Sequence, residues 1–418
     1  MRNTFYSVLK NRDFFRLWVA QILSQVAGFM LTFALILHIY YSTTTVSLVM
    51  LATALPSVIF GPFSGVLSDK IQCKKVLIWT NFLRFLVALV LLISKENTLA
   101  ILEIVFLMST ITQFFSPAEL SSIPLIIKKE NLVQANSVYI TSQYAALILG
   151  YGIAGPLQAL VGSDILFIII ALMFLLSAFS ISLMSNYDKK ENHRILIFKI
   201  AKSIVSVWRA TKEGLSYIWQ NQKIFSPTIK LVVGWAVLGS FIVVLPAFSE
   251  STLGISARFA GALLIVPAGA GMLIASFLLN KFHNWKKEKV MTVGFILCGF
   301  SLLALSFYHF YQFFSFSLIL AILLMVIMGG TVGLVYISAQ TLQHLNSDEN
   351  MRGRIFGIAA MLINLAMSLP AILVGGIADL TSPVFTLILI ALFIIVYSFY
   401  LVFADEFTGS DAYGRENN

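Results

Sequence analysis

Charged side chains are scarce in this sequence of 418 residues. Asp, Glu, Lys and Arg make up 11% of it, whereas 59% of the residues are hydrophobic. A mean hydropathy of +0.90 leaves too little polar surface to cover a water-soluble domain. Apolar runs long enough to cross about 30 Å of hydrocarbon, at roughly 20 residues each, recur along the chain. A water-soluble fold is therefore excluded, and the composition predicts an all-α membrane protein with many transmembrane helices.

Cysteine is rarer still, since only Cys73 and Cys298 occur. They provide no disulfide framework and no spacing typical of metal ligands, so we expect no metal site. The five histidines are scattered, and there is no H-E-x-x-H motif, no P-loop and no G-x-S-x-G motif. We therefore expect no enzyme, no catalytic residue and no cofactor.

A formal net charge of +9 would suit a nucleic-acid-binding protein if the basic residues formed one patch. Instead they concentrate at the two termini, in one long polar stretch and in alternate loops. Lys95 and Arg258 fall on the other side of the membrane in this arrangement, and Arg84 falls within an apolar run. Because cytoplasmic loops carry the excess of Lys and Arg, we expect both termini to be cytoplasmic and no nucleic-acid partner.

Twelve apolar runs are predicted to span the membrane, and the first should remain because no small-residue cleavage site follows it. They are 15–40, 45–68, 76–94, 98–127, 132–161, 164–185, 226–249, 256–280, 289–308, 313–345, 355–380 and 383–404. We expect two six-helix bundles related by a pseudo-twofold axis. The N-terminal bundle is 1–185, a cytoplasmic linker is 186–225, and the C-terminal bundle with a cytoplasmic tail is 226–418.

The linker carries apolar residues at helical spacing, and its charged residues point elsewhere. This pattern predicts an amphipathic helix on the inner membrane surface, and both a simple tether and a regulatory element fit it. The apolar positions are Ile197, Ile200, Ile204, Trp208, Leu215 and Ile218.

Glycine and proline interrupt the fifth and eleventh apolar runs at matching places in the two halves. Paired interruptions of this kind point to the moving, cavity-forming helices of a transporter. Close helix packing is the alternative, since transmembrane helices tolerate both residues. The residues are Gly150, Gly152, Gly155 and Pro156 in one half, and Pro370, Gly375 and Gly376 in the other.

The loop after the second run reads 65-GVLSDKIQCKK-75 and fits the pattern G-x-L-x-D-K-x-x-x-K-K. With twelve spans divided six and six, it resembles the signature between helices 2 and 3 of the major facilitator superfamily. Cys73 departs from the pattern, because a basic residue is usual there. Segments along nearly the whole chain, such as 116-SPAELSSIPLI-126 and 213-EGLSYIWQN-221, look like the drug-efflux branch that includes macrolide exporters and the enterobactin exporter.

The resemblance implies a cytoplasmic latch between the second and eleventh helices. A glycine lets the helices approach closely, and an aspartate can neutralise the positive end of a helix that begins near 352-RGR-354. A pure topology signal is the alternative. The latch would consist of Gly65, Asp69, Lys70, Lys74, Lys75, Arg352 and Arg354.

The resemblance also implies a central cavity lined by helices 1, 4, 7 and 10. Abundant Phe, Leu, Met and Tyr would suit bulky amphipathic molecules there, with a few polar groups setting orientation. Each polar residue could equally form a helix-packing hydrogen bond. The candidates are Gln21, Gln25, Gln113, Glu119, Trp235 and Gln340.

Arg84 and Glu119 are ionisable groups within predicted spans, where each needs a partner or a wet cavity. They lie at similar predicted depth, so a structural ion pair and a proton-carrying carboxylate both remain open. Many relatives carry an acidic residue where 28-GFM-30 places Phe29, so proton coupling rests on analogy here.

Together with the composition, the resemblance implies a monomeric secondary-active transporter in the bacterial cytoplasmic membrane. It would export amphipathic or hydrophobic, drug-like molecules by alternating access, with proton antiport. A lysophospholipid or siderophore transporter of the same fold is the alternative, and a transport-inactive receptor is a more distant one. The lipid bilayer, the substrate and protons are the expected partners.

Overall fold

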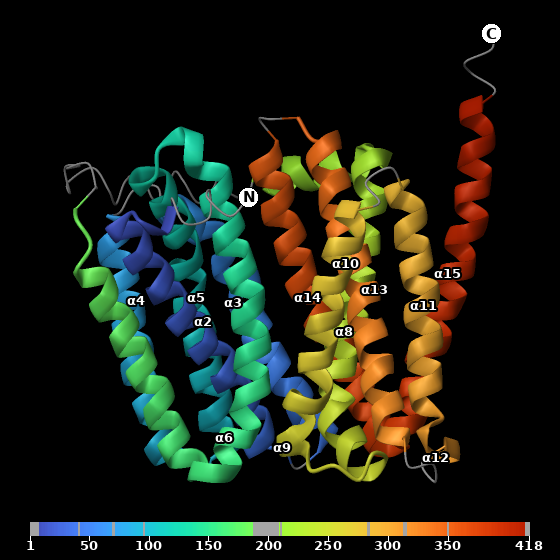
Figure 1. Cartoon of the computed structure of the whole chain (residues 1–418), viewed down its shortest axis with the longest axis horizontal. Coiled ribbons are helices and arrows are strands. Elements are labelled where there is room, and N and C mark those ends of the chain that lie inside the picture. Colours follow the sequence, from blue (N-terminus) through green and yellow to red (C-terminus); the bar gives the residue numbers. More distant parts are fainter. Residues whose placement is uncertain are drawn as a thin grey trace. The chain divides into compact units, whose positions relative to one another are not determined.

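The computed structural model describes residues 8–40, 42–68, 72–94, 97–186, 209, 211–281, 285–311, 316–348 and 351–413. All regular elements within these ranges are helices, and eleven of the helices are long and apolar enough to cross a membrane (Figure 1). The predicted all-α membrane fold is thereby confirmed.

The chain divides into two compact units. Unit 1 comprises residues 1–41 and 48–215, and unit 2 comprises residues 42–47 and 216–418. Unit 1 contains most of α3 (Thr43–Ser68) together with α2 (Arg12–His38), α4 (Cys73–Ser94), α5 (Thr98–Ile126), the short η1 (Lys129–Asn131) and α6 (Leu132–Ser182).

Unit 2 contains the first turn of α3 and the remaining described spans. They are α8 (Gln222–Ser251), α9 (Ala257–Ala260), η3 (Gly261–Ile265), α10 (Val266–Lys281), α11 (Lys287–Ser306), α12 (Tyr308–Tyr311), α13 (Ser317–Asn346), α14 (Arg352–Leu380) and α15 (Pro383–Tyr413). The predicted runs agree with these helices to within a few residues at each start.

The 51-residue helix α6 contains two of the predicted spans. They are joined at Gly162, whose φ of 80° and ψ of 167° interrupt the helix. A positive φ of this size is readily adopted only by glycine. The interruption lies between 161 and 164, where the sequence predicted the boundary, so the eleven long helices account for twelve spans.

The predicted interruption at residues 150–156 is helical, because Gly162 is the one non-helical residue inside α6. A Cβ atom on Gly150 would lie 2.4 Å from the Cβ of Phe29 and 3.1 Å from the carbonyl oxygen of Val26. Only glycine therefore allows α2 and α6 to pack this closely. In the second half, Pro370 lies inside the continuous helix α14.

The described end of the linker is a short helix, residues 211–220, whose residues from Ser216 onward belong to unit 2. Ile218 is buried against Ile224 and Ile355, whereas Leu215 is 42% exposed. The Tyr217 hydroxyl donates a 2.7 Å hydrogen bond to the Asp348 carboxylate, which raises the pKa of Tyr217. The earlier apolar positions of the predicted amphipathic helix lie outside the described residues.

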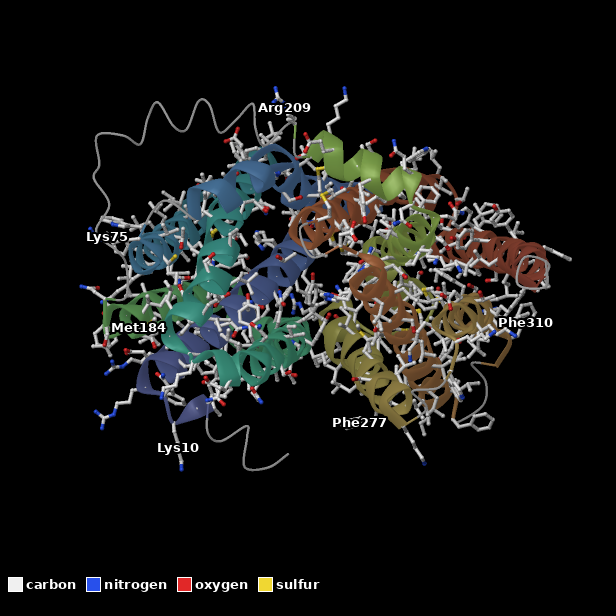
Figure 2. The ribbon with its side chains drawn as sticks, turned by 90° about the horizontal axis from the view of Figure 1, so that it is seen from above. Lys10, Lys75, Met184, Arg209, Phe277 and Phe310 are labelled. Atoms are coloured by element: carbon white, nitrogen blue, oxygen red, sulfur yellow. The ribbon has the colours of Figure 1, made fainter. Side chains whose placement is uncertain are left out.

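Large apolar side chains are exposed along the outside of the helices. Phe277 is 76% exposed and Phe310 is 75% exposed, and Figure 2 shows both at the outer side of the unit 2 ribbon. Side chains of this kind would be unfavourable in water but are stable against lipid. The exposed surface thus supports the membrane assignment independently of the helix lengths.

Candidate functional site

A group of buried polar side chains occupies the interior of unit 1. It consists of Ser24 on α2, Asn81 and Arg84 on α4, Glu119 on α5 and Tyr139 on α6, and is called the polar cluster below. Arg84 is 4% exposed and Glu119 is fully buried. Two ionisable side chains inside one helix bundle require compensating contacts, because hydrocarbon provides none.

Arg84 is held on one side by hydrogen bonds and on its faces by aromatic rings. Its Nη1 donates to Ser24 Oγ at 2.7 Å, and Ser24 donates in turn to Asn81 Oδ1 at 2.9 Å. The guanidinium carbon lies 4.5 Å from the ring centre of Phe115 and 5.7 Å from that of Phe174. Desolvated cation–π contacts of this kind contribute about 2 kcal/mol.

The opposite edge of Arg84 has no partner, because Nε and Nη2 make no hydrogen bond. These two nitrogens form the fork that binds a carboxylate with two parallel hydrogen bonds. Each buried donor left without an acceptor costs about 1–3 kcal/mol. Arg84 therefore has two buried N–H groups without an acceptor, and a carboxylate would satisfy both of them.

Glu119 likewise has one carboxylate oxygen that accepts no hydrogen bond. Its Oε2 accepts a 2.8 Å hydrogen bond from the Tyr139 hydroxyl, while Oε1 is buried without a partner. Glu119 acts electrostatically on Arg84, but the two groups form no direct ion pair. The nearby Gln21 donates from Nε2 to the backbone carbonyl of Tyr139 at 3.0 Å, and so fixes α2 against α6.

The other polar candidates of unit 1 differ in their involvement. Gln25 is half-buried and its Oε1 has no partner, but its side chain is a hydrogen-bonding neighbour of Glu119. Gln113 is half-buried on α5, and its Nε2 makes a long 3.4 Å contact with the carbonyl of Ser109 one turn earlier. The structure therefore brings Arg84 and Glu119 into one cluster and leaves Gln113 out of it.

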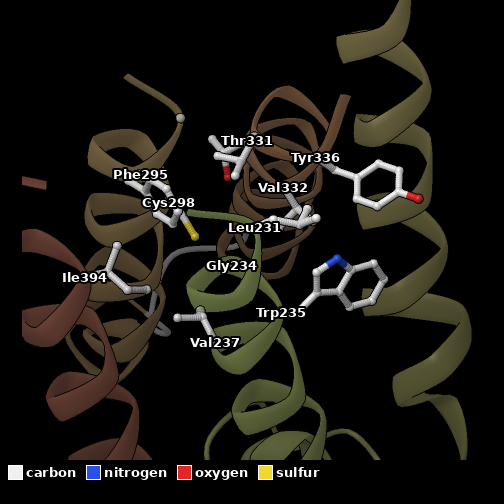
Figure 3. Close-up of a pocket in the computed structure, with 12 residues that line it drawn as sticks. Leu231, Gly234, Trp235, Val237, Phe295, Cys298, Thr331, Val332, Tyr336 and Ile394 are labelled. Atoms are coloured by element: carbon white, nitrogen blue, oxygen red, sulfur yellow. The ribbon is translucent and has the colours of Figure 1, made fainter. Parts of the chain in front are cut away.

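Unit 2 contains an apolar pocket between α8, α11, α13 and α15 (Figure 3). The free space at its centre is about 20 Å³, room for about one water-sized sphere, and the rest of the pocket is open. Phe295 and Cys298 lie on the α11 side, and Ile394 projects from α15. Gly234 on α8 borders this space, since a Cβ atom there would approach no side chain closer than 3.7 Å.

Trp235 and Tyr336 stand together at the α8–α13 side of this pocket, as Figure 3 shows. Their ring centres are 5.9 Å apart with the planes at 81°, an edge-to-face contact. Gln340 donates from Nε2 to the Tyr336 hydroxyl at 2.7 Å. Two of the predicted cavity residues, Trp235 and Gln340, thus meet through Tyr336, and together they provide an amphipathic surface.

The latch predicted from the sequence falls largely outside the described part of the chain. Asp69 and Lys70 are not described, and neither are the surroundings of Gly65 or the side chains of Arg352 and Arg354. Lys74 donates from Nζ to the carbonyl oxygen of Met184 at 2.6 Å, whereas Lys75 is exposed and projects outward in Figure 2. A cation at the carbonyl end of a helix is favourable. The latch stays a prediction.

Sequence reasoning missed several of these side chains. Tyr139, Ser24 and Asn81 looked like ordinary helix residues, and nothing in their spacing indicated their partners. Lys230 was also missed, although it lies inside α8 and is only 3% exposed. A basic residue within an apolar run is a signal that could have identified it.

Comparisons with known proteins agree with this architecture. Residues 17–371 match the sequence model of the Major Facilitator Superfamily. BacE of Bacillus amyloliquefaciens, named as a bacilysin exporter, is 26% identical over 368 residues, 85% of this chain and 86% of BacE. Macrolide efflux protein A of Streptococcus pyogenes is 23% identical over 384 residues, 88% of this chain and 89% of that protein.

Solved structures share the fold at low sequence identity. A POT family transporter in complex with a thioalcohol-conjugated peptide superposes with a TM-score of 0.75 at 12% identity, covering 96% of this chain and 99% of that one. A point mutant of the nucleoside transporter NupG gives a TM-score of 0.70 at 13% identity, covering 93% of this chain and 98% of that one. At such identities the likeness concerns the fold alone.

Proposed function

Because the chain belongs to the Major Facilitator Superfamily, we propose that this transporter exports amphipathic or hydrophobic small molecules from the cytoplasm by alternating access. The observation that carries the proposal is similarity over more than four fifths of the chain to two proteins named for efflux, BacE and Macrolide efflux protein A. The bacterial cytoplasmic membrane, with both termini inside, is the proposed location.

The chemistry of the pocket in unit 2 supports an amphipathic substrate. Its walls are almost entirely apolar, and the Trp235–Tyr336 pair offers an aromatic surface with a hydroxyl held by Gln340. Such a surface binds by buried area and stacking, while the polar groups set orientation. A sugar would leave many hydroxyl groups unpaired there and is a poor fit.

The polar cluster supports proton coupling at Glu119. Its free carboxylate oxygen can take a proton while Oε2 keeps the Tyr139 hydrogen bond, so the charge can change without dismantling the site. The absence of a direct ion pair with Arg84 leaves the carboxylate available for this role. A proton taken up in one state and released in the other would drive export.

A lysophospholipid or a siderophore remains the alternative substrate, since an apolar pocket with a polar rim suits a lipid chain or a large chelator as well. The same membrane fold can move all three classes. Transport measured with one compound of each class separates them.

The test is transport into proteoliposomes that contain the purified full-length protein. We expect a labelled macrolide to accumulate when the lumen is more acidic than the medium, and a protonophore to abolish the accumulation. Protein-free liposomes with the same gradient control for passive trapping of weak bases. Bacilysin, a lysophospholipid and a ferric siderophore complete the panel. Accumulation of none of them would refute export, and accumulation that ignores the gradient would refute proton coupling.

A further inference from the structure

A groove lies between the first halves of α3 and α5 within unit 1. Its free space is about 340 Å³, more than twice the roughly 150 Å³ of an apolar cavity that binds benzene. Its mouth is open, since Leu48 is 37% exposed and Leu55 is 38% exposed. Apart from Glu103 its lining is apolar, and consists of Leu48, Leu51, Ala52 and Leu55 on α3 with Leu102 and Phe106 on α5. The groove therefore has room for part of an apolar chain.

Two features of the helices keep this groove open. Ala52 lies between Leu48 and Leu55 on one face of α3, so only a methyl group occupies the middle of the space. Beside it, the Ser109 hydroxyl on α5 donates a hydrogen bond to the backbone carbonyl oxygen of Thr53, which joins the two helices at this point. The groove is thus part of the packed bundle, and a ligand can enter it without moving α3 or α5.

Glu103 is the one charged residue among those that line the groove. It is exposed, and it forms no hydrogen bond or ion pair with another described residue. It is the sixth residue of α5, about 8 Å along the helix from Thr98 at 1.5 Å per residue, which is near the boundary between head groups and hydrocarbon. A carboxylate on the exposed side of a membrane span needs a partner, and the described part of the chain provides none.

From this groove and its carboxylate we infer a binding site for a membrane lipid whose head group carries a primary amine. The ammonium group binds Glu103, and an acyl chain lies along the leucines of α3. A primary ammonium donates up to three hydrogen bonds to a carboxylate, whereas a quaternary ammonium donates none and an anionic head group is repelled. A lipid is the occupant because the exposed leucines at the mouth face hydrocarbon in a membrane.

The site is independent of the proposed transport, and only its leaflet depends on the proposed orientation. One span, α4, separates α3 from α5, so both helices begin on the same side of the membrane. With the termini in the cytoplasm, that side is the outer face. The groove then lies in the outer leaflet.

Photolabelling of the full-length protein in liposomes tests the site. Three lipids with the same photoreactive acyl chain differ only in an ethanolamine, choline or glycerol head group, and the bulk lipid contains no amine. Peptide mass spectrometry locates the label. We expect residues 48–55 and 98–106 to be labelled at least threefold more by the ethanolamine lipid than by the choline lipid, the size of effect that one exposed ion pair produces, and least by the glycerol lipid.

Three variants separate the charge from the shape of the groove. Glu103→Gln should lower labelling by the ethanolamine lipid to the level of the choline lipid. Glu130→Gln makes the same change at an exposed residue of η1 and should leave the preference intact. Ala52→Leu should fill the groove and lower its labelling by all three lipids. Labelling elsewhere on the chain should be unchanged in each variant, which shows that the protein is folded.

Two results would overturn the site: equal labelling of the groove by the ethanolamine and choline lipids, or a preference that survives Glu103→Gln. Displacement of the ethanolamine lipid by a macrolide at a much lower mole fraction would also overturn the lipid assignment, because the groove would then belong to a drug-like amine. No step of this assay requires transport. A protein that transports nothing would refute the proposed function, while the labelling alone decides the lipid site.

Discussion

Replacing Glu119 with glutamine removes the charge of the side chain but keeps its length and shape. Glutamine has the same length and can still accept the hydrogen bond that Tyr139 donates at 2.8 Å. It cannot take up and release a proton in the cycle. The substitution therefore separates a structural counter-charge for Arg84 from a proton-coupling group.

The expected loss of stability follows from the contacts of Arg84. Removing one member of a directly bonded buried ion pair costs about 3–5 kcal/mol. Arg84 and Glu119 form no direct pair, and the contacts of Arg84 with Ser24, Phe115 and Phe174 survive the substitution. We therefore expect Glu119→Gln to lower the free energy of unfolding by only about 1–2 kcal/mol, because the longer-range attraction alone is lost.

Two assays on one preparation decide between the roles. We expect Glu119→Gln to melt only a few degrees lower, to exchange substrate at close to the wild-type rate, and to lose at least tenfold in accumulation driven by a pH gradient. The control is Glu130→Gln, which makes the same change at an exposed residue of η1. Normal pH-driven accumulation by a stable Glu119→Gln protein would refute the coupling role. Unfolding of most of the protein would instead identify a permanent counter-charge.

Matched pairs of substitutions test three further features. Gly234→Ala should stabilise α8 by up to about 1 kcal/mol, because the added Cβ meets only ordinary contacts. Gly294→Ala should destabilise the protein, because the added Cβ would lie 2.9 Å from Val335 Cγ2. Thermal melts measure both effects. Gly234→Leu should fill the pocket and weaken substrate binding roughly tenfold in an equilibrium binding assay, with folding retained. Lys74→Ala should cost about 1–3 kcal/mol in unfolding experiments through its bond to Met184, whereas exposed Lys75→Ala should cost little.

The positions of the helices were predictable because the bilayer fixes their length. An apolar run must be about 20 residues long to cross hydrocarbon, so its ends follow from where polar residues begin. This is why α5 and α15 start at the predicted residues, Thr98 and Pro383. The turn at Gly162 was also located. A helix of 51 residues is more than twice as long as one span of about 20 residues, so the chain must turn within it.

The candidate site was predictable only as a set of unusual residues. Arg84 and Glu119 stood out because charge is costly within a span. Their partners did not, because the rotation and crossing of α2, α4, α5 and α6 decide that Arg84 meets Ser24 and that Glu119 meets Tyr139. Asp379 lies near a span end, where water is the expected partner, yet its carboxylate accepts a hydrogen bond from the backbone N–H of Thr44, 335 residues away in sequence.

The polar cluster belongs entirely to unit 1, and the apolar pocket belongs entirely to unit 2. Under the proposed function, a proton at Glu119 can drive a substrate held beside Trp235 only through an equilibrium that both ligands bias, since neither site contains residues of the other. Thermodynamic linkage then makes the effect reciprocal, so substrate must favour proton binding or release to the same extent. Both α3, at residues 47 and 48, and the short helix 211–220, at residues 215 and 216, pass from one unit to the other, so such an equilibrium would act through these two described elements.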